Sequence, residues 1–274
     1  MKLIIFEDHL TESLKPFSFN HATFEIKTGL FSNLDRFIAF FSKHEIYLIV
    51  RDEIKDVIKF RFPKYHVNPN IIPSGQCINA KVVWDEEYTK LLDSENLLFF
   101  KNKSEISLED FNSKIRLLKN DDSISYINYL WDSIYLFNST IKKDFLKIKN
   151  KQISDIDQVC LINKDNIFIN NTTNIKPGVV IDATNGPVYI GENVKIDIGA
   201  LIQGPVFIDK DSFISLGSKI RGGTLIGPNC KIGGEVTNSI FHGFSNKVHD
   251  GFIGHSYIGE WVNIGAGTNN SNLK

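Results

Sequence analysis

Three ionisable side chains lie close together in a glycine-containing stretch near the end of the chain. His242, His249 and Asp250 fall within residues 233–254. An imidazole titrates near neutral pH, so a histidine in such a segment can take a proton from a reacting group. A zinc site formed by His242, His249 and His255 is the weaker alternative, because their spacing matches no compact ligand pattern and no cysteine accompanies them. Proton transfer is therefore the chemistry that this stretch predicts.

A repeat of six residues leads up to this stretch and must position it. Isoleucine recurs in steps of six, and each of these isoleucines is followed four residues later by a small or β-branched residue. A six-residue period does not fit an α-helix and matches the hexapeptide repeat of a parallel β-helix, in which three short strands make one coil. We expect these isoleucines to point into a prism-shaped core: Ile190, Ile196, Ile202, Ile208, Ile214, Ile220, Ile226 and Ile232.

The six-residue period slips after Ile232. The next isoleucine in the pattern is Ile240, and steps of six from it pass through Asn246 and Phe252. We therefore expect an irregular or extruded segment within residues 233–254 to interrupt the prism. Loops carried by a rigid scaffold are where functional sites usually lie.

The first part of the chain, up to about residue 150, has a different pattern. Short apolar runs predict buried strands at residues 3–6, 46–50 and 97–100, and helical spacing predicts a helix over 29–41 and a connecting helix over 123–151. Strands that alternate with helices are typical of a layered α/β domain with a parallel sheet.

Composition and charge exclude several classes of protein. Lys and Arg number 31 against 32 Asp and Glu, so no sequence-wide basic field exists to hold nucleic acid or a membrane surface. The apolar runs fall short of the ~18 residues of a transmembrane helix. The three cysteines lack any CxxC spacing, which argues against a disulfide scaffold. We expect a cytoplasmic protein that acts on small molecules.

Several stretches carry a resemblance to a known family. Residues 182–187 read Asp-Ala-Thr-Asn-Gly-Pro, and residues 246–274 contain Asn-Lys-Val-His-Asp-Gly and, further on, Asn-Ile-Gly-Ala-Gly-Thr. Together with a hexapeptide repeat behind an α/β domain, they resemble a divergent bacterial branch of the bifunctional GlmU-type enzymes, UDP-N-acetylglucosamine diphosphorylase (uridyltransferase)/glucosamine-1-phosphate N-acetyltransferase. Weaker support comes from Trp131-Asp132 and from residues 25–29.

The resemblance implies a fold and an assembly. We expect an α/β nucleotidyltransferase-like (Rossmann-like) domain with its connecting helix over residues 1–155. A left-handed parallel β-helix of hexapeptide repeats, acyltransferase-like, is expected over residues 156–274. Family members continue for several more coils past the position of Lys274, so we expect the β-helix to be truncated at its C-terminus. The resemblance also implies a homotrimer.

The resemblance further implies sugar-nucleotide biosynthesis. The expected reactions are transfer of a nucleotidyl group from UTP to a (N-acetyl)hexosamine 1-phosphate, with Mg²⁺, and acetyl transfer from acetyl-CoA to a hexosamine 1-phosphate. Asp8 or Asp85 could hold the metal, although no motif singles them out. Two alternatives remain: a nucleotidyltransferase for another sugar 1-phosphate whose β-helix serves only oligomerisation, or a non-catalytic sugar-nucleotide-binding protein.

The family pattern assigns roles to residues in the C-terminal part. His249 occupies the position of the family's catalytic general base, which would take the proton of the sugar amine. Backbone N–H groups of a glycine-rich turn would meet the acyl-CoA or the developing oxyanion. The implied substrate-binding residues are Asn263, Lys247 and Asn246, and the implied acyl-CoA-binding residues are Gly265, Ala266 and Gly267.

The N-terminal part departs from the family pattern. No glycine-rich phosphate loop follows Phe6, and residues 16–22 read Pro-Phe-Ser-Phe-Asn-His-Ala where the divergent branch has an Arg-Pro pair. Lys15, His21 and Lys27 are therefore the candidate nucleotide-binding cations, although lysine cannot reproduce the bidentate fork of arginine.

Overall fold

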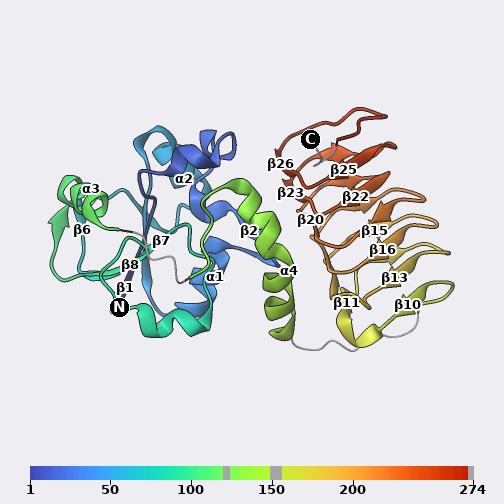
Figure 1. The fold of residues 1–274 in the computed structure, drawn as a ribbon, viewed down its shortest axis with the longest axis horizontal. Helices are drawn as coiled ribbons and strands as arrows, with labels where there is room; N and C mark the ends of the chain where they lie inside the picture. The colour runs from blue at the N-terminus through green and yellow to red at the C-terminus, as the bar shows by residue number, and fades with distance from the viewer. Residues whose placement is uncertain (120–123, 149–155, 271–274) are drawn as a thin grey trace. The chain divides into compact units, whose positions relative to one another are not determined.

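The structure is a computed structural model, which describes residues 1–119, 124–148 and 156–270 (Figure 1). The chain forms two compact units. The first comprises Met1–Ile26 and Phe31–Asp132, and the second comprises Lys27–Leu30 and Ser133–Lys274. The expected domain boundary between residues 155 and 156 adjoins residues 149–155, which lie outside the described residues.

The first unit is built on a five-stranded sheet in the order β5-β4-β1-β7-β8. The four strands β5, β4, β1 and β7 are parallel, and β8 is antiparallel to β7. The expectation of an all-parallel sheet is therefore wrong at this edge, because a continuous apolar run indicates burial on both faces and not the direction of the strand. The strands are β1 (Lys2–Phe6), β4 (Glu45–Ile49), β5 (His66–Val67), β7 (Gly75–Asn79) and β8 (Phe99–Asn102).

Helices flank this sheet, and each face of it carries its own hydrophobic core. The helix expected from residue 29 begins only at Asn33. Ser32 and Asp35 explain the start, since each side chain accepts a hydrogen bond from the backbone N–H of the other (both 3.1 Å). The helices are α1 (Asn33–Phe40), α2 (Lys55–Arg61) and α3 (Leu108–Leu117).

Short elements complete the N-terminal part of the chain. They are η1 (Thr11–Leu14), η2 (Phe17–Phe19), η3 (Thr23–Glu25), β2 (Lys27–Thr28), β3 (Phe31–Ser32), η4 (Asp52–Ile54), β6 (Ile71–Ile72), η5 (Glu86–Leu91) and β9 (Ile106–Ser107). Across the described part of the chain, no helix combines the length and the apolar character that crossing a membrane requires.

The second unit contains a left-handed parallel β-helix made of three sheets (Figure 1). The first sheet contains β10 (Cys160–Ile162), β13 (Val180–Asp182), β16 (Leu201–Gln203), β19 (Lys219–Ile220), β22 (Glu235–Thr237) and β25 (Phe252–Gly254). The second contains β11 (Ile167–Ile169), β14 (Val188–Ile190), β17 (Val206–Ile208), β20 (Thr224–Ile226), β23 (Ile240–Gly243) and β26 (Tyr257–Glu260). The third contains β12 (Asn174–Ile175), β15 (Lys195–Ile196), β18 (Phe213–Ile214), β21 (Lys231–Ile232) and β24 (Asn246–Lys247). The turn η6 (Lys164–Asn166) lies in the first coil.

The predicted isoleucine positions are confirmed. All eight, from Ile190 to Ile232, are buried in one hydrophobic core. They pair between successive coils, as Ile190 does with Ile208 and Ile208 with Ile226, so equal side chains stack above one another.

The segment after Ile232 is irregular in coil length, as expected, but it is not an extruded loop. Strands β22 to β25 continue the three sheets, and the inward position opposite Ile226 is Phe241, not Ile240. The expected steps through Ile240, Asn246 and Phe252 are therefore wrong by one residue. The coil is shortened at corners where Gly234 and Asn238 adopt positive φ (68° and 44°), a conformation that permits a tight turn.

A helix covers part of the second sheet. Helix α4 (Leu130–Leu146) contributes Ile134, Phe137 and Ile141 to a cluster with outward side chains of the β-helix. Residues 27–30 join this cluster through Leu30, whose N–H donates to the buried carboxylate of Asp144 (2.9 Å).

Candidate functional site

The carboxyl ends of the parallel strands in the first unit gather charged side chains. Strand β1 lies between β4 and β7. The chain adds β4 and β5 on one side of β1 and then β7 and β8 on the other side, so the strand order reverses at β1. Crevices at such a switch point are where open α/β sheets bind ligands. Glu7 and Asp8 follow β1, Arg51 follows β4 and Lys81 follows β7.

The buried Glu7 forms an ion pair with the partly buried Arg51 at this edge. Arg51 Nη1 donates to Glu7 Oε1 (2.7 Å), and the backbone N–H of Arg51 donates to Oε2 (3.1 Å). The backbone N–H and the hydroxyl of Thr23 also donate to Oε1 (2.8 and 3.0 Å). Glu7 thus holds the end of β4 and the start of η3 at one carboxylate.

Arg51 also fixes the segment where the family resemblance expects an arginine. Its Nη2 donates to the backbone carbonyls of Ser18 and of His21 (3.0 Å for His21). The buried ring of His21 stacks on Phe17, with 4.7 Å between centroids, and its Nδ1 lies 2.7 Å from Asn20 Oδ1. The loop is therefore shaped by an arginine from a different strand end.

Asp8 and Lys81 form a second buried pair. Lys81 Nζ lies 3.2 Å from Asp8 Oδ1, and both side chains are almost fully buried. Asn79 Nδ2 donates to Asp8 Oδ2 (3.0 Å), and the N–H of Leu10 donates to Oδ1 (2.8 Å). Burial lowers the pKa of Lys81, and the attraction of Asp8 opposes that shift.

A pocket of about 260 Å³ opens at the same edge of the sheet. Strand ends supply carboxylates and Arg51, and the facing side is α3, which contributes the exposed Arg116. Cations beside hydrogen-bonding groups suit a phosphorylated ligand. The pocket is lined by Glu7, Asp8, His9, Ile49, Val50, Arg51, Asp52, Glu53, Asn68, Leu108, Asn112, Ile115 and Arg116.

The three nucleotide-binding candidates from the sequence are not brought together. Lys15 is exposed and pairs with Glu12. Lys27 belongs to the second unit, where its Nζ lies 3.6 Å from Asp209 Oδ2. His21 is the one whose loop is bound to the carboxyl edge, through Arg51.

Sequence reasoning missed Arg51 and Lys81. Each lies two residues beyond a parallel strand, and a cation at such a position was the signal that could have found them. The two suggested metal ligands have other partners, because Asp8 is paired with Lys81 and Asp85 Oδ1 accepts the N–H of Glu87 (3.2 Å) at the start of η5.

In the second unit, His249 is exposed in the bend between β24 and β25. Its backbone carbonyl accepts a hydrogen bond from Lys247 Nζ (2.8 Å). Lys247 itself is buried, so its ammonium faces the interior of the coils and not the solvent. Of the residues implied as substrate-binding, Asn246 and Asn263 do meet, since Asn246 Nδ2 donates to Asn263 Oδ1 (2.8 Å).

The glycine-rich turn lies beside the same bend. The N–H of Gly267 donates to the carbonyl of Asp250 (2.9 Å), so this implied acyl-CoA donor is already hydrogen-bonded. Gly265 and Ala266 are exposed, and the carbonyl of Gly265 accepts the hydroxyl of Thr268 (2.9 Å). Among the described residues, the backbone N–H groups of Gly265 and Ala266 have no such bond, so these are the ones left to meet a ligand.

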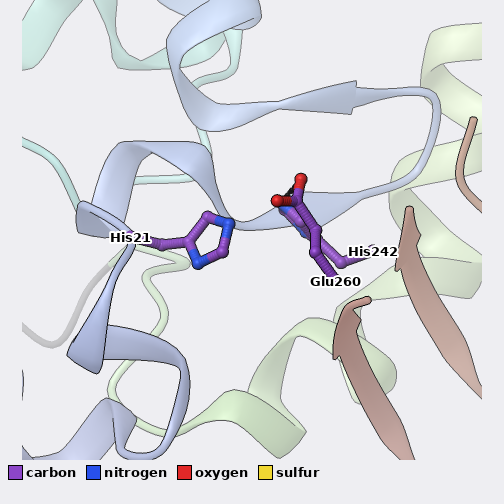
Figure 2. A group of neighbouring side chains, drawn as sticks. All are labelled: His21, His242 and Glu260. Carbon is purple, nitrogen blue, oxygen red and sulfur yellow. Dashed lines mark ion pairs between the residues drawn. The ribbon is translucent and has the colours of Figure 1, made fainter. Parts of the chain in front are cut away.

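His242 lies on β23 within a different polar group. Its Nδ1 is 2.9 Å from the hydroxyl of Tyr257. Its Nε2 is 3.8 Å from Glu260 Oε1 on β26, and Figure 2 shows these two side chains together. His255 lies at a corner with positive φ after β25. Among the described residues, His242, His249 and His255 do not form a group that could hold a metal ion.

Residues 3–153, more than half of the chain, match a family described as sugar nucleotidyl transferase. The match covers the strand ends, the pocket and the loop of His21. No curated protein matches the chain.

Proposed function

The chain belongs to the sugar nucleotidyl transferase family, and on this premise we propose that its first unit transfers a nucleotidyl group from UTP to a (N-acetyl)hexosamine 1-phosphate. The pocket at the carboxyl ends of β1, β4 and β5 is the observation that carries the proposal. It combines the guanidinium of Arg116 with the network around Arg51 and with carboxylates that a divalent cation could bridge to a polyphosphate.

The reaction needs positioning and charge compensation. An oxygen of the sugar phosphate attacks the α-phosphorus of UTP, the bond from that phosphorus to the bridging oxygen breaks, and pyrophosphate leaves. Arg116 reaches the pocket from α3 and would bind phosphate oxygens in a bidentate manner. Arg51 would act through the loop that it holds, because its guanidinium already binds Glu7 and two loop carbonyls.

Nucleotidyltransferases of this kind commonly use a divalent metal, and we propose Mg²⁺. Mg²⁺ prefers carboxylate oxygens and neutralises phosphate charge when bound. Asp52 and Glu53 are exposed and line the pocket, so these carboxylates fit the role. Asp8 fits less well, because the ammonium of Lys81 already lies at its carboxylate.

Pyrophosphate release tests this function. The folded chain is incubated with Mg²⁺, a panel of nucleoside triphosphates and several sugar 1-phosphates, including N-acetylglucosamine 1-phosphate. We expect turnover with UTP and a hexosamine 1-phosphate, and Arg116→Met to lower kcat/KM by about 10- to 100-fold. Arg221→Met is the matched control, because Arg221 is an exposed arginine paired with Glu235 in the second unit.

Absence of turnover with every pair contradicts the proposal and favours a non-catalytic sugar-nucleotide-binding protein. Turnover with a different sugar 1-phosphate or triphosphate corrects the substrate and keeps the reaction. That outcome, together with no acetyl transfer by the parent chain, would favour the alternative in which the β-helix serves oligomerisation alone.

A second candidate activity is acetyl transfer by the β-helix, as in the bifunctional GlmU-type enzymes. The observation that favours it is the exposed imidazole of His249 on a bend whose backbone is hydrogen-bonded. His249 would take the proton of a hexosamine 1-phosphate amine as that amine attacks the thioester of acetyl-CoA and CoA thiolate leaves. Assembly as a homotrimer and a cytoplasmic location belong to this proposal.

Acetyl transfer is tested with His249→Ala. We expect kcat for acetyl transfer to fall about 10²- to 10⁴-fold, the usual loss on removing a general base. His255→Ala is the control, because His255 is likewise an exposed histidine at a corner of the β-helix. An unchanged kcat in His249→Ala would remove His249 as the base.

A further inference from the structure

One inward position of the β-helix holds a charged side chain. In the third sheet, successive coils stack Ile175, Ile196, Ile214, Ile232 and then Lys247. Lys247 is 1% exposed, and burial lowers its pKa while the charge of Asp250 opposes the shift. An apolar side chain would fill this place without burying a charge, so the ammonium requires a separate explanation.

The ammonium has a defined partner. Lys247 Nζ donates to the carbonyl of His249 (2.8 Å). The next two carbonyls of the bend are bound by backbone groups of neighbouring coils, since Asp250 O accepts from Gly267 N (2.9 Å) and Gly251 O accepts from Glu235 N (3.0 Å). The carbonyl of His249 is therefore bound by a side chain, whereas the carbonyls of Asp250 and Gly251 are bound by backbone N–H groups.

The preceding coil provides room for this ammonium. Lys219 pairs with Glu235 in the next coil. The residues that precede them, Ser218 and Gly234, are therefore equivalent positions of successive coils. A Cβ on Gly234 would lie 2.9 Å from Lys247 Nζ and 2.6 Å from the carbonyl oxygen of Gly251. The glycine thus leaves the space that the lysine head occupies.

We propose that Lys247 is a positioning residue that sets the backbone of the His249 bend so that the imidazole has a fixed outward direction. The proposal rests on the acetyl transfer proposed above, and it adds a buried residue that never touches the substrate. By holding the carbonyl of His249, Lys247 restrains the peptide from which the proton acceptor projects. Proton transfer requires such fixed geometry at the reacting atoms.

The test compares Lys247→Met with Ile232→Met in the full chain. Both place methionine at an inward position of the same stack, and only the first removes a hydrogen bond to the bend. Hydrogen exchange is measured on peptides covering residues 248–254. We expect about tenfold faster exchange there in Lys247→Met, and no change there in Ile232→Met. We also expect kcat for acetyl transfer to fall about 10- to 100-fold with KM for acetyl-CoA unchanged.

Equal exchange at residues 248–254 in the two variants would overturn the proposal. So would faster exchange in Lys247→Met with an unchanged kcat, because the lysine would then have only a structural role. Failure of acetyl transfer itself is recognised separately, as the lack of activity in the parent chain. In that case hydrogen exchange alone decides whether Lys247 holds the bend.

Discussion

At the scale of single residues, the first unit keeps two oppositely charged pairs where the sheet ends. Glu7 with Arg51 and Asp8 with Lys81 are both largely removed from water. A buried ion pair contributes little net stability compared with apolar side chains, yet loss of one member leaves an uncompensated charge. These pairs therefore serve the shape of the edge more than the stability of the unit.

Removing the ammonium of Lys81 tests this account. We expect Lys81→Met to lower the free energy of unfolding by about 3–5 kcal/mol at pH 7, because Asp8 is then buried without its cation. The double variant Asp8→Asn, Lys81→Met is expected to recover more than half of the loss, since Asn79 can still donate to the amide oxygen. Urea unfolding measures all three proteins, and a double variant as unstable as the single one would contradict the prediction.

Residues of the candidate site could be selected from the sequence to different degrees. His249 and Asn263 were selected from a linear motif, which a sequence displays directly, and their roles stay predictions. Arg51 and Lys81 were missed because they come together only when β4 and β7 lie on either side of β1, and strand order is not written in the spacing of residues. His21 was selected for its charge, whereas its backbone carbonyl is what Arg51 binds.

At the scale of elements, the isoleucine period predicted the coils up to Ile232 because each inward residue meets its equivalent in the next coil. The prediction failed in the following coil, where corners at Gly234 and Asn238 shorten the repeat and the inward residue becomes Phe241. A period cannot show where a corner omits a residue. In the same way, the apolar run of β8 indicated its burial and not its direction.

Lys247 on β24 makes the unfolding free energy of the β-helix depend on pH. The pKa of Lys247 is lower in the folded protein than the ordinary lysine value of 10.5, so protonation favours the unfolded chain. Stability from this residue is complete above pH 10.5 and is lost as the pH falls through the folded-state pKa. We therefore expect the unfolding free energy of the parent to rise relative to that of Lys247→Met between pH 7 and pH 10.5.

Chemical denaturation of the two proteins at several pH values measures this difference. Ile232→Met serves as the reference for a methionine in the same stack, and its difference from the parent should not vary with pH. A constant difference between the parent and Lys247→Met would show that the ammonium is not desolvated.

At the scale of the whole molecule, the two units are not two consecutive stretches of the chain. Residues 27–30 belong to the second unit, although the chain on either side of them belongs to the first. Leu30 lies in one cluster with Ile134 of α4 and with Leu225 and Ile240 of the β-helix. The second unit therefore needs a contribution from the beginning of the chain.

Leu30 and Leu34 lie four residues apart and belong to different units, so substituting each of them tests this assignment. We expect Leu30→Ala to cost about 2–3 kcal/mol and to speed hydrogen exchange in β17, β20 and β23. Leu34→Ala is the matched control, because Leu34 lies in a core of the first unit and should speed exchange in β1 and β4. Faster exchange in β1 and β4 with Leu30→Ala would contradict the assignment of Leu30 to the second unit.

The place of Leu30 in that cluster has a consequence for synthesis on the ribosome. Its partners Phe207, Leu225 and Ile240 are translated roughly 200 residues later, which takes about 10–40 s at usual elongation rates. During that interval, the buried members of the cluster that Leu30 can contact are those of α4, because α4 is translated before the coils that carry the other members. The contacts of Leu30 are therefore completed only after the ribosome has translated the coils that contain Leu225 and Ile240.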